Sequence, residues 1–328
     1  MPDPDLRPLT SDRRETVALV IPLFNEEAVL PLLIEEVERF RVARPEVTQV
    51  VLVDDGSRDA TLALARRLTD GRPGYVLVAF ARNFGHQLAV TAGLHVADAD
   101  AAIILDADLQ DPLDVAGQMI DRWREGYDVV YGVRETRDGE SAFKKLTAAA
   151  FYRFFRWATD LEMPLDTGDF RLMSRRMIEA YRQLHEQQPF VRGLISWLGF
   201  NQVGLPYRRA ARAAGETKYP LKKMLRFAMT GLTAFSDKPL RMAVWLGFGS
   251  AALAAGGIVW VLVVRLFLER AVPGWASTVL PAFFFGGVQL FFLGILGLYL
   301  GRVFDEVRGR PRYVVRETWE SEARRAEG

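Results

Sequence analysis

Two aspartates one residue apart, Asp106 and Asp108, have the type and spacing that most directly indicate chemistry. Alternate residues of an extended segment point the same way, so both carboxylates can face one site. With Gln110 nearby they supply the hard oxygen ligands that Mg²⁺ and Mn²⁺ prefer, and such a metal would also bind a diphosphate. A lone Asp-x-Asp is a weak signal, but this one ends the apolar run Ile103–Leu105, which predicts a buried strand.

The first 200 residues alternate between β-branched apolar runs and segments of helical periodicity. We predict strands at Val17–Leu23, Val50–Val53, Val76–Phe80, Ile103–Leu105 and Val129–Tyr131. We predict helices at Val29–Phe40, Ala60–Leu68, Gln87–Val96 and Leu113–Trp123. This alternation is typical of an α/β domain with a mostly parallel, doubly wound sheet.

Ligands of open parallel sheets bind outside the carboxyl ends of the strands. Four predicted strands are followed there by polar segments, at Pro22–Glu26, Asp54–Ser57, Arg82–Asn83 and Asp106–Gln110. Helix capping explains such residues one at a time, since Asp, Asn and Ser commonly open helices. Four such strand ends at one rim favour a binding crevice instead, and Arg134 directly follows the fifth strand at the same rim.

The composition excludes several classes of function. The 42 basic and 41 acidic residues nearly cancel, so the charge does not indicate a nucleic-acid-binding protein. The absence of cysteine excludes disulfides, thiolate catalysis and thiolate metal sites. Residues 1–14 are polar and contain three prolines, which predicts a disordered leader and no cleaved signal peptide.

Two runs of 23 uncharged residues, Met242–Val264 and Thr278–Leu300, occupy the C-terminal third. At about 1.5 Å of rise per residue, each helix would span about 34 Å, enough for a bilayer core of about 30 Å. We therefore predict a two-helix transmembrane hairpin within 239–304; two buried helices of a soluble protein are the alternative. Basic residues flank the pair, at Lys238, Arg241, Arg302, Arg308, Arg310 and Arg312. By the positive-inside rule, both termini are expected in the cytoplasm.

Residues 220–238 carry an apolar stripe at helical spacing with basic residues between its members. This pattern predicts an amphipathic juxtamembrane helix in the headgroup layer; a core-facing helix of the globular domain is the alternative. The surrounding stretch 206–241 has nine basic and two acidic residues, which suits an anionic leaflet. The predicted segments are a leader 1–14, a catalytic domain 15–219, this helix 220–238, the hairpin 239–304 and a cytoplasmic tail 305–328.

Seven motifs, in order, resemble those of the family 2 glycosyltransferases, which have a GT-A (Rossmann-like) fold. Within that family the chain resembles the polyprenyl-phosphate sugar transferases: the bacterial prenyl-phosphate glucosyltransferases of the O-antigen glucosylation type, and dolichol-phosphate mannose synthase. The motifs are IPLFNEE (21–27), VDDGSRDAT (53–61), RNFGHQLAVTAGL (82–94), LDADLQDP (105–112), YGVRETRDGES (131–141), TGDFRLMSR (167–175) and GETKY (215–219). The likeness runs from Val17 almost to the C-terminus.

The resemblance implies a role for each matching residue. The nucleotide and ribose would be lined by Pro22, Phe24 and Glu26, and the base held by Val53 and Asp55. The metal ligands would be Asp106, Asp108 and Gln110, with Ala107 at the diphosphate. A flexible loop containing Gly215 would close over the diphosphate with Arg212 and Lys218.

On the acceptor side, the resemblance implies that Arg134 lies between the donor and the lipid phosphate, and that Asp169 contacts the sugar or organises the phosphate site. Arg137, Ser141 and Lys144 are further candidates for the acceptor phosphate, although the two cations also fit a solvated helix face. The catalytic set is then Asp106, Asp108, Arg134 and Asp169.

A lipid phosphate is already anionic at neutral pH, so its attack on a sugar needs no general base. The protein must instead neutralise two adjoining anions, with a metal at the departing diphosphate and arginines at the acceptor. His86 and His95 could serve as bases by their type. His95 lies on a helical pattern and His86 fits a turn or cap, so we include neither.

We therefore predict inverting transfer of a hexose, glucose from UDP-glucose, to undecaprenyl phosphate for cell-envelope glycosylation. Donation from GDP-mannose or UDP-aminoarabinose stays open, as does an inactive membrane-anchored scaffold. The chain lacks the QxxRW signature of a processive polysaccharide synthase. Family likeness further implies a homo-oligomer, a tetramer, at the inner membrane as a multi-pass protein with its catalytic domain on the cytoplasmic side and no nucleic-acid partner.

Overall fold

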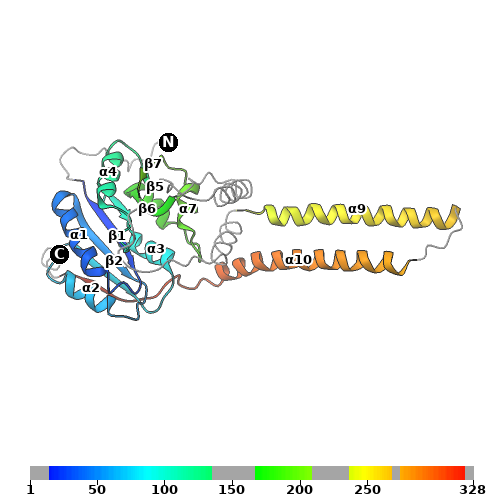
Figure 1. Ribbon diagram of the computed structural model, residues 1–328, viewed down its shortest axis with the longest axis horizontal. Coiled ribbons are helices and arrows are strands. Elements are labelled where there is room, and N and C mark those ends of the chain that lie inside the picture. Colours follow the sequence, from blue (N-terminus) through cyan, green and yellow to red (C-terminus); the bar gives the residue numbers. More distant parts are fainter. Residues whose placement is uncertain (1–14, 135–166, 209–235, 268–273, 322–328) are drawn as a thin grey trace. The chain divides into compact units, whose positions relative to one another are not determined.

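The computed structural model describes residues 15–134, 167–208, 236–267 and 274–321 (Figure 1). The chain divides into two compact units. The first contains the sheet with its helices, and the second contains the two long helices of the C-terminal third.

The first unit is built on one eight-stranded sheet in the order β7-β5-β6-β4-β1-β2-β3-β8. Its strands are β1 Val17–Leu23, β2 Val47–Asp54, β3 Tyr75–Phe80, β4 Ala101–Ile104, β5 Val129–Arg134, β6 Thr167–Ser174, β7 Gln202–Tyr207 and β8 Val315–Glu320. β1 pairs in parallel with β2 and β4, as do β2 with β3 and β5 with β7. β6 is antiparallel to β4 and β5, and β8 is antiparallel to β3. The mostly parallel α/β sheet predicted from the sequence is confirmed.

Helices cover both faces of the sheet. They are α1 Leu30–Ala43, α2 Thr61–Thr69, α3 His86–Val96, α4 Leu113–Arg124, α6 Arg175–Arg182 and α7 Val191–Trp197. Every residue of β1 is buried, and alternate β1 side chains join the apolar residues of α1 and α4 in one core. α3 packs very closely on the sheet, because a Cβ on Gly93 would lie only 2.3 Å from Val20 Cγ1. Burial from two sides accounts for the unbroken apolar runs of the central strands.

All five predicted strands and all four predicted helices are present, with ends shifted by a few residues. The sequence analysis predicted none of β6, β7 and β8. β6 contains the buried charged residues Asp169 and Arg171, and β7 contains both glycine and proline in a partly exposed strand. Neither strand presents the continuous apolar run that identifies a buried strand.

β8 lies within residues 305–328, where a cytoplasmic tail was predicted. It pairs along β3 at the edge of the sheet, and Tyr313 stacks on Phe80 with ring centroids 5.0 Å apart. Glu317 of β8 forms an ion pair with Arg66 of α2. The chain after Pro311 therefore belongs to the unit that contains the sheet.

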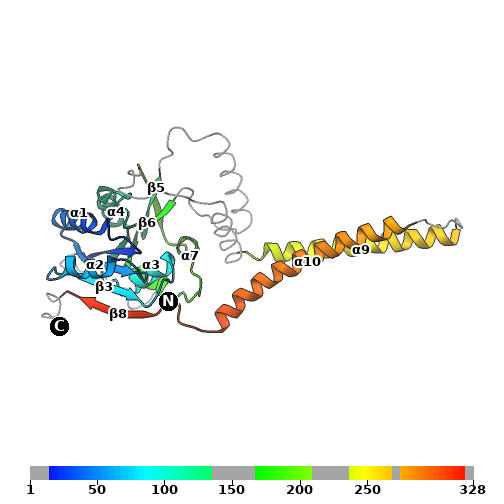
Figure 2. The same cartoon turned by 60° about the horizontal axis from the view of Figure 1, so that its bottom comes forward.

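The second unit contains α9 Lys238–Phe267 and α10 Trp275–Val307, which lie side by side (Figures 1 and 2). Helices thus occur at both predicted membrane spans. In the part of the chain that the structure describes, one segment, Phe284–Val307, is long and apolar enough to cross a membrane. The two-span hairpin therefore stays a prediction. Residues 220–235 of the predicted juxtamembrane helix lie outside the described residues.

Candidate active site

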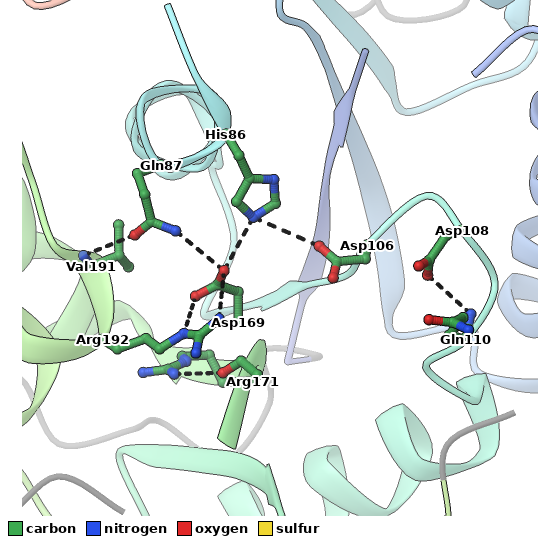
Figure 3. A network of polar contacts seen from close by, with 10 residues as sticks. His86, Gln87, Asp106, Asp108, Gln110, Asp169, Arg171, Val191 and Arg192 are labelled. Carbon is green, nitrogen blue, oxygen red and sulfur yellow. Dashed lines mark hydrogen bonds and ion pairs between the residues drawn. The ribbon is translucent and has the colours of Figure 1, made fainter. Parts of the chain in front are cut away.

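The Asp-x-Asp pair lies in the loop that follows β4 (Figure 3). Leu109 has a φ of +56°, so the chain turns sharply after the pair. The turn allows the Gln110 backbone N–H to donate to Asp108 Oδ1 at 3.1 Å. In Figure 3 the Asp106 carboxylate points toward His86 and that of Asp108 toward Gln110. The loop therefore carries both carboxylates, and the Gln110 residue is largely buried; their binding of one metal stays a prediction.

Asp106 has a raised pKa because it is buried and lies near other carboxylates. Burial, together with the charges of Asp169, Asp111 and Asp108, raises the pKa of Asp106 to about 6 against the opposing effect of His86. A divalent cation would relieve this repulsion. Among the described residues, no three His, Asp or Glu side chains gather around one cation position. The pair therefore fits Mg²⁺ or Mn²⁺ bound by one or two carboxylates, with water and substrate phosphates completing the coordination shell.

Asp169, in contrast to Asp106, has a lowered pKa and a guanidinium close to its carboxylate. Its carboxylate is almost fully buried and contacts Arg192 Nε at 2.7 Å and Arg192 Nη2 at 3.2 Å. Gln87 Nε2 and His86 Nε2 each lie 3.2 Å from Asp169 Oδ2. Burial alone would raise the pKa of Asp169, but the charge of Arg192 and the hydrogen bonds from His86 and Arg192 hold it well below its usual range. Asp169 thus lies near Asp106 with its oxygens engaged by the protein, and its predicted role at the sugar or phosphate stays a prediction.

His86 is a site residue that the sequence analysis left out. Its Nε2 atom lies 3.2 Å from Asp169 Oδ2 and 3.7 Å from Asp106 Oδ1, so one ring nitrogen faces both carboxylates. These charges outweigh burial and raise the pKa of His86. The signal that could have identified it is its position directly after the third predicted strand end, Arg82–Asn83, at the same rim.

Asp55 holds the loop that delivers His86. Its buried carboxylate accepts hydrogen bonds from Asn83 Nδ2 at 2.8 Å, Phe84 N at 2.6 Å and Gly85 N at 2.9 Å. Gly85 has a φ of +106°, which suits glycine at this turn into α3. Both Asp55 oxygens therefore serve the loop, and its predicted contact with the base stays a prediction.

The predicted nucleotide residues occupy different environments. Pro22 is buried within β1, whereas the Phe24 residue is 42% exposed at the rim and could contact a ligand. The Glu26 backbone N–H donates to Thr61 Oγ1 at 2.8 Å. The Val53 side chain is fully buried and packs toward Gly93 of α3, so the predicted contact with the base would have to come from its backbone and stays a prediction.

Arg134 reaches the same loop from the end of β5. Its Nε donates to Tyr207 Oη at 3.5 Å, and Tyr207 Oη donates to Asp111 Oδ1 at 2.6 Å. The Arg134 guanidinium lies close over Gly168, since a Cβ on Gly168 would be 2.6 Å from one of its nitrogens. The structure therefore brings Arg134 to the loop that contains the Asp-x-Asp pair, through Tyr207, which the sequence analysis missed.

The remaining predicted site residues, Arg137, Ser141, Lys144, Arg212 and Lys218, lie outside the described residues. Ala107 is buried between Asp106 and Asp108. A diphosphate could therefore contact the backbone of this loop more readily than the Ala107 side chain.

Several known proteins are similar to this chain. The model of the family "Glycosyl transferase family 2" matches residues 18–182. The chain is 42% identical to the uncharacterized glycosyltransferase YkcC of Bacillus subtilis, over 94% of this chain and 95% of that protein. It is 36% identical to the bactoprenol glucosyl transferase of Shigella phage SfII, over 92% of this chain and 98% of that protein. Among solved structures, it resembles glucosyl-3-phosphoglycerate synthase from Mycobacterium tuberculosis in complex with Mn²⁺, uridine diphosphate and glucosyl-3-phosphoglycerate, with a TM-score of 0.45 and 20% identity, over 67% of this chain and 78% of that one.

Proposed function

The chain belongs to glycosyl transferase family 2, and from this premise we propose that it transfers glucose from UDP-glucose to undecaprenyl phosphate. The observation that carries the proposal is the 36% identity to a bactoprenol glucosyl transferase over 92% of the chain. Likeness over almost the full length includes the region of α9 and α10 as well as the sheet. It therefore supports a lipid acceptor as well as a nucleotide-sugar donor.

The donor side of the proposal rests on Asp106 and Asp108. These carboxylates would hold Mg²⁺ or Mn²⁺, which when bound would neutralise the charge that develops on the departing nucleoside diphosphate. The exposed Phe24 would contact the nucleotide from the rim. Direct displacement of the diphosphate by the acceptor would invert the anomeric carbon.

The acceptor side needs a cation more than a base. A phosphate oxygen is anionic at neutral pH and can attack without losing a proton. Asp169 has little basicity to offer, because its oxygens accept hydrogen bonds from protein donors and its pKa is low. Arg134 would bind the lipid phosphate through its guanidinium, which can donate several hydrogen bonds to one phosphate.

The membrane part of the proposal rests on α10. We propose that its segment Phe284–Val307 and α9 both cross the inner membrane, with the catalytic domain on the cytoplasmic side. A lipid acceptor is presented at the membrane surface, so a site that uses it must be anchored there. A homo-oligomer, a tetramer, is part of the same proposal.

The proposal is tested by incubating the detergent-purified full chain with undecaprenyl phosphate, Mn²⁺ and each of three radiolabelled donors. We expect label from UDP-glucose to enter the lipid fraction, with much less from GDP-mannose or UDP-aminoarabinose. The Asp108→Asn variant, which we expect to be inactive, is the background control: it measures the label that reaches the lipid fraction without enzymatic transfer. Preferred use of another donor would overturn the glucose assignment, and transfer only to water or a soluble acceptor would overturn the lipid assignment.

A further inference from the structure

We propose that His86 is a positioning residue that orients the metal-binding carboxylate of Asp106, with Asp169 as its fixed anchor. The inference rests on the metal role proposed for Asp106, and it is independent of which sugar, base or lipid the enzyme uses. It gives a function to the contacts between His86 and the two carboxylates, which the transfer reaction itself does not require.

The anchor is held from two sides of the site. Asp169 lies on β6 and receives hydrogen bonds from Gln87 of α3 and from Arg192 of α7. Gln87 in turn accepts a hydrogen bond from the Val191 backbone N–H at 3.0 Å through its Oε1 atom (Figure 3). Donors on separate elements fix both oxygens, so the Asp169 carboxylate cannot rotate without breaking several bonds.

His86 is held from its backbone as well as from its ring. Asp55 binds the preceding loop through three hydrogen-bond donors and so places the first residue of α3. An ionised carboxylate can only accept, so His86 Nε2 donates toward Asp169. The same nitrogen faces Asp106 Oδ1 at 3.7 Å, an ion-pair distance and longer than a hydrogen bond.

This arrangement matches the way outer residues orient metal ligands. A carboxylate ligand needs a fixed rotamer to meet a cation, and partners in the next layer of residues supply that constraint. Because His86 Nε2 faces both carboxylates, at 3.2 Å from Asp169 Oδ2 and 3.7 Å from Asp106 Oδ1, it can transmit the orientation of Asp169 to Asp106. Loss of such a partner typically weakens metal binding by about 10–100-fold.

The test measures binding of Mn²⁺ alone to the full chain in detergent, by the electron paramagnetic resonance signal of free Mn²⁺. We expect His86→Ala to raise the dissociation constant about 10-fold or more. We expect His86→Gln, whose amide nitrogen can replace Nε2 as a donor, to recover part of the loss. The matched control is His95→Ala on the same helix, because His95 Nδ1 contacts the Thr91 carbonyl and neither carboxylate.

Kinetics add a second readout. In His86→Ala, we expect the metal concentration for half-maximal activity to rise about as much as the dissociation constant, while kcat at saturating Mn²⁺ falls less. An unchanged Mn²⁺ affinity with lowered activity would overturn the proposal, because His86 would then act on substrate directly. Equal weakening by His95→Ala, or no recovery in a folded His86→Gln variant, would also overturn it by showing a general structural effect.

The binding test separates this inference from the proposed function. If the wild-type chain binds Mn²⁺ and the variants behave as expected, the inference stands even where no glucose reaches the lipid. The opposite result is also possible: label is transferred to the lipid, but the wild-type chain shows no Mn²⁺ binding that the Asp108→Asn change removes. In that case the inference fails while the lipid assignment stands.

Discussion

Asp169 and Asp106 both face the Nε2 atom of His86, at 3.2 and 3.7 Å, yet the protein surrounds the two carboxylates differently. Asp169 is paired with the Arg192 guanidinium and is almost fully buried, and its pKa lies well below the usual range. Burial, together with the charges of Asp169, Asp111 and Asp108, raises the pKa of Asp106 to about 6 against the opposing charge of His86. Two aspartates that face one imidazole nitrogen thus have pKa values shifted in opposite directions.

This difference suggests that Asp169 has a structural role and Asp106 a chemical one. Where the chain supplies its own cation, the carboxylate is a structural part of the site, and removing it would leave buried positive charge uncompensated. Where the chain leaves negative charge crowded at a rim, a cation from solution can bind. If the two carboxylates divide their roles in this way, changes at Asp169 should affect stability and changes at the Asp-x-Asp loop should affect activity.

The largest effect is expected at the Asp-x-Asp loop. Asp108→Asn should lower kcat/KM at least about 10³-fold, since metal stabilisation of a departing diphosphate contributes several kcal/mol. Without metal, the melting temperature of the Asp108→Asn variant should not be lower than that of the wild-type chain, because the substitution removes one of several carboxylates that repel one another. Asp114→Asn, an exposed change six residues further along, is the control. Full activity of the wild-type chain in excess EDTA would contradict the metal assignment.

The reverse pattern is expected at Asp169. Asp169→Asn should lower the free energy of unfolding by about 3 kcal/mol, because it leaves the Arg192 charge and the nearby buried Arg171 without their carboxylate. Urea unfolding followed by circular dichroism measures this loss. A variant as stable as the wild-type chain would show that Asp169 is not structural and would remove the contrast with Asp108→Asn.

A third change sharpens the comparison on the acceptor side. Arg134→Ala should lower kcat/KM for the lipid acceptor about 10²-fold, the scale for losing one preorganised charged contact. Stability should change little. Kinetics in a neutral detergent exclude a general attraction to anionic lipid, and Arg122→Ala, at an exposed arginine of α4, controls for loss of surface charge. Equal kinetics of the two variants would contradict the role of Arg134.

The sequence predicted the parts of this molecule that depend on local pattern. Uninterrupted apolar runs identified the five strands, and the Asp-x-Asp motif after the fourth located the loop. The contacts of Asp169 were not predictable, because His86 and Arg192 meet it from 83 and 23 residues away. Val53 was assigned to the base by resemblance, and apolar pattern alone could predict only that its side chain is buried in a sheet covered on both faces. β8 was missed because its pairing partner, β3, lies over 200 residues earlier.

The smallest effect is expected at Tyr207, which links Arg134 to Asp111 on the metal-loop side of the site. Tyr207→Phe removes the hydroxyl that donates to Asp111 Oδ1 at 2.6 Å and accepts from Arg134 Nε at 3.5 Å. Loss of this partner for a buried carboxylate should lower the free energy of unfolding by about 1–2 kcal/mol. We expect kcat/KM for the acceptor to fall about 5-fold, or about 1 kcal/mol, because Arg134 loses one of its fixed contacts.

Two further variants decide whether that effect passes through Arg134. Tyr181→Phe removes another buried hydroxyl, one that pairs with Thr91 Oγ1 at 2.8 Å, and should cost similar stability without changing acceptor kinetics. The double variant Arg134→Ala/Tyr207→Phe should be hardly worse in acceptor kcat/KM than Arg134→Ala alone, since residues that act through one another are not additive. Fully additive losses would mean that Tyr207 acts independently of Arg134. The acceptor arginine would then need a different partner to hold it at the metal loop.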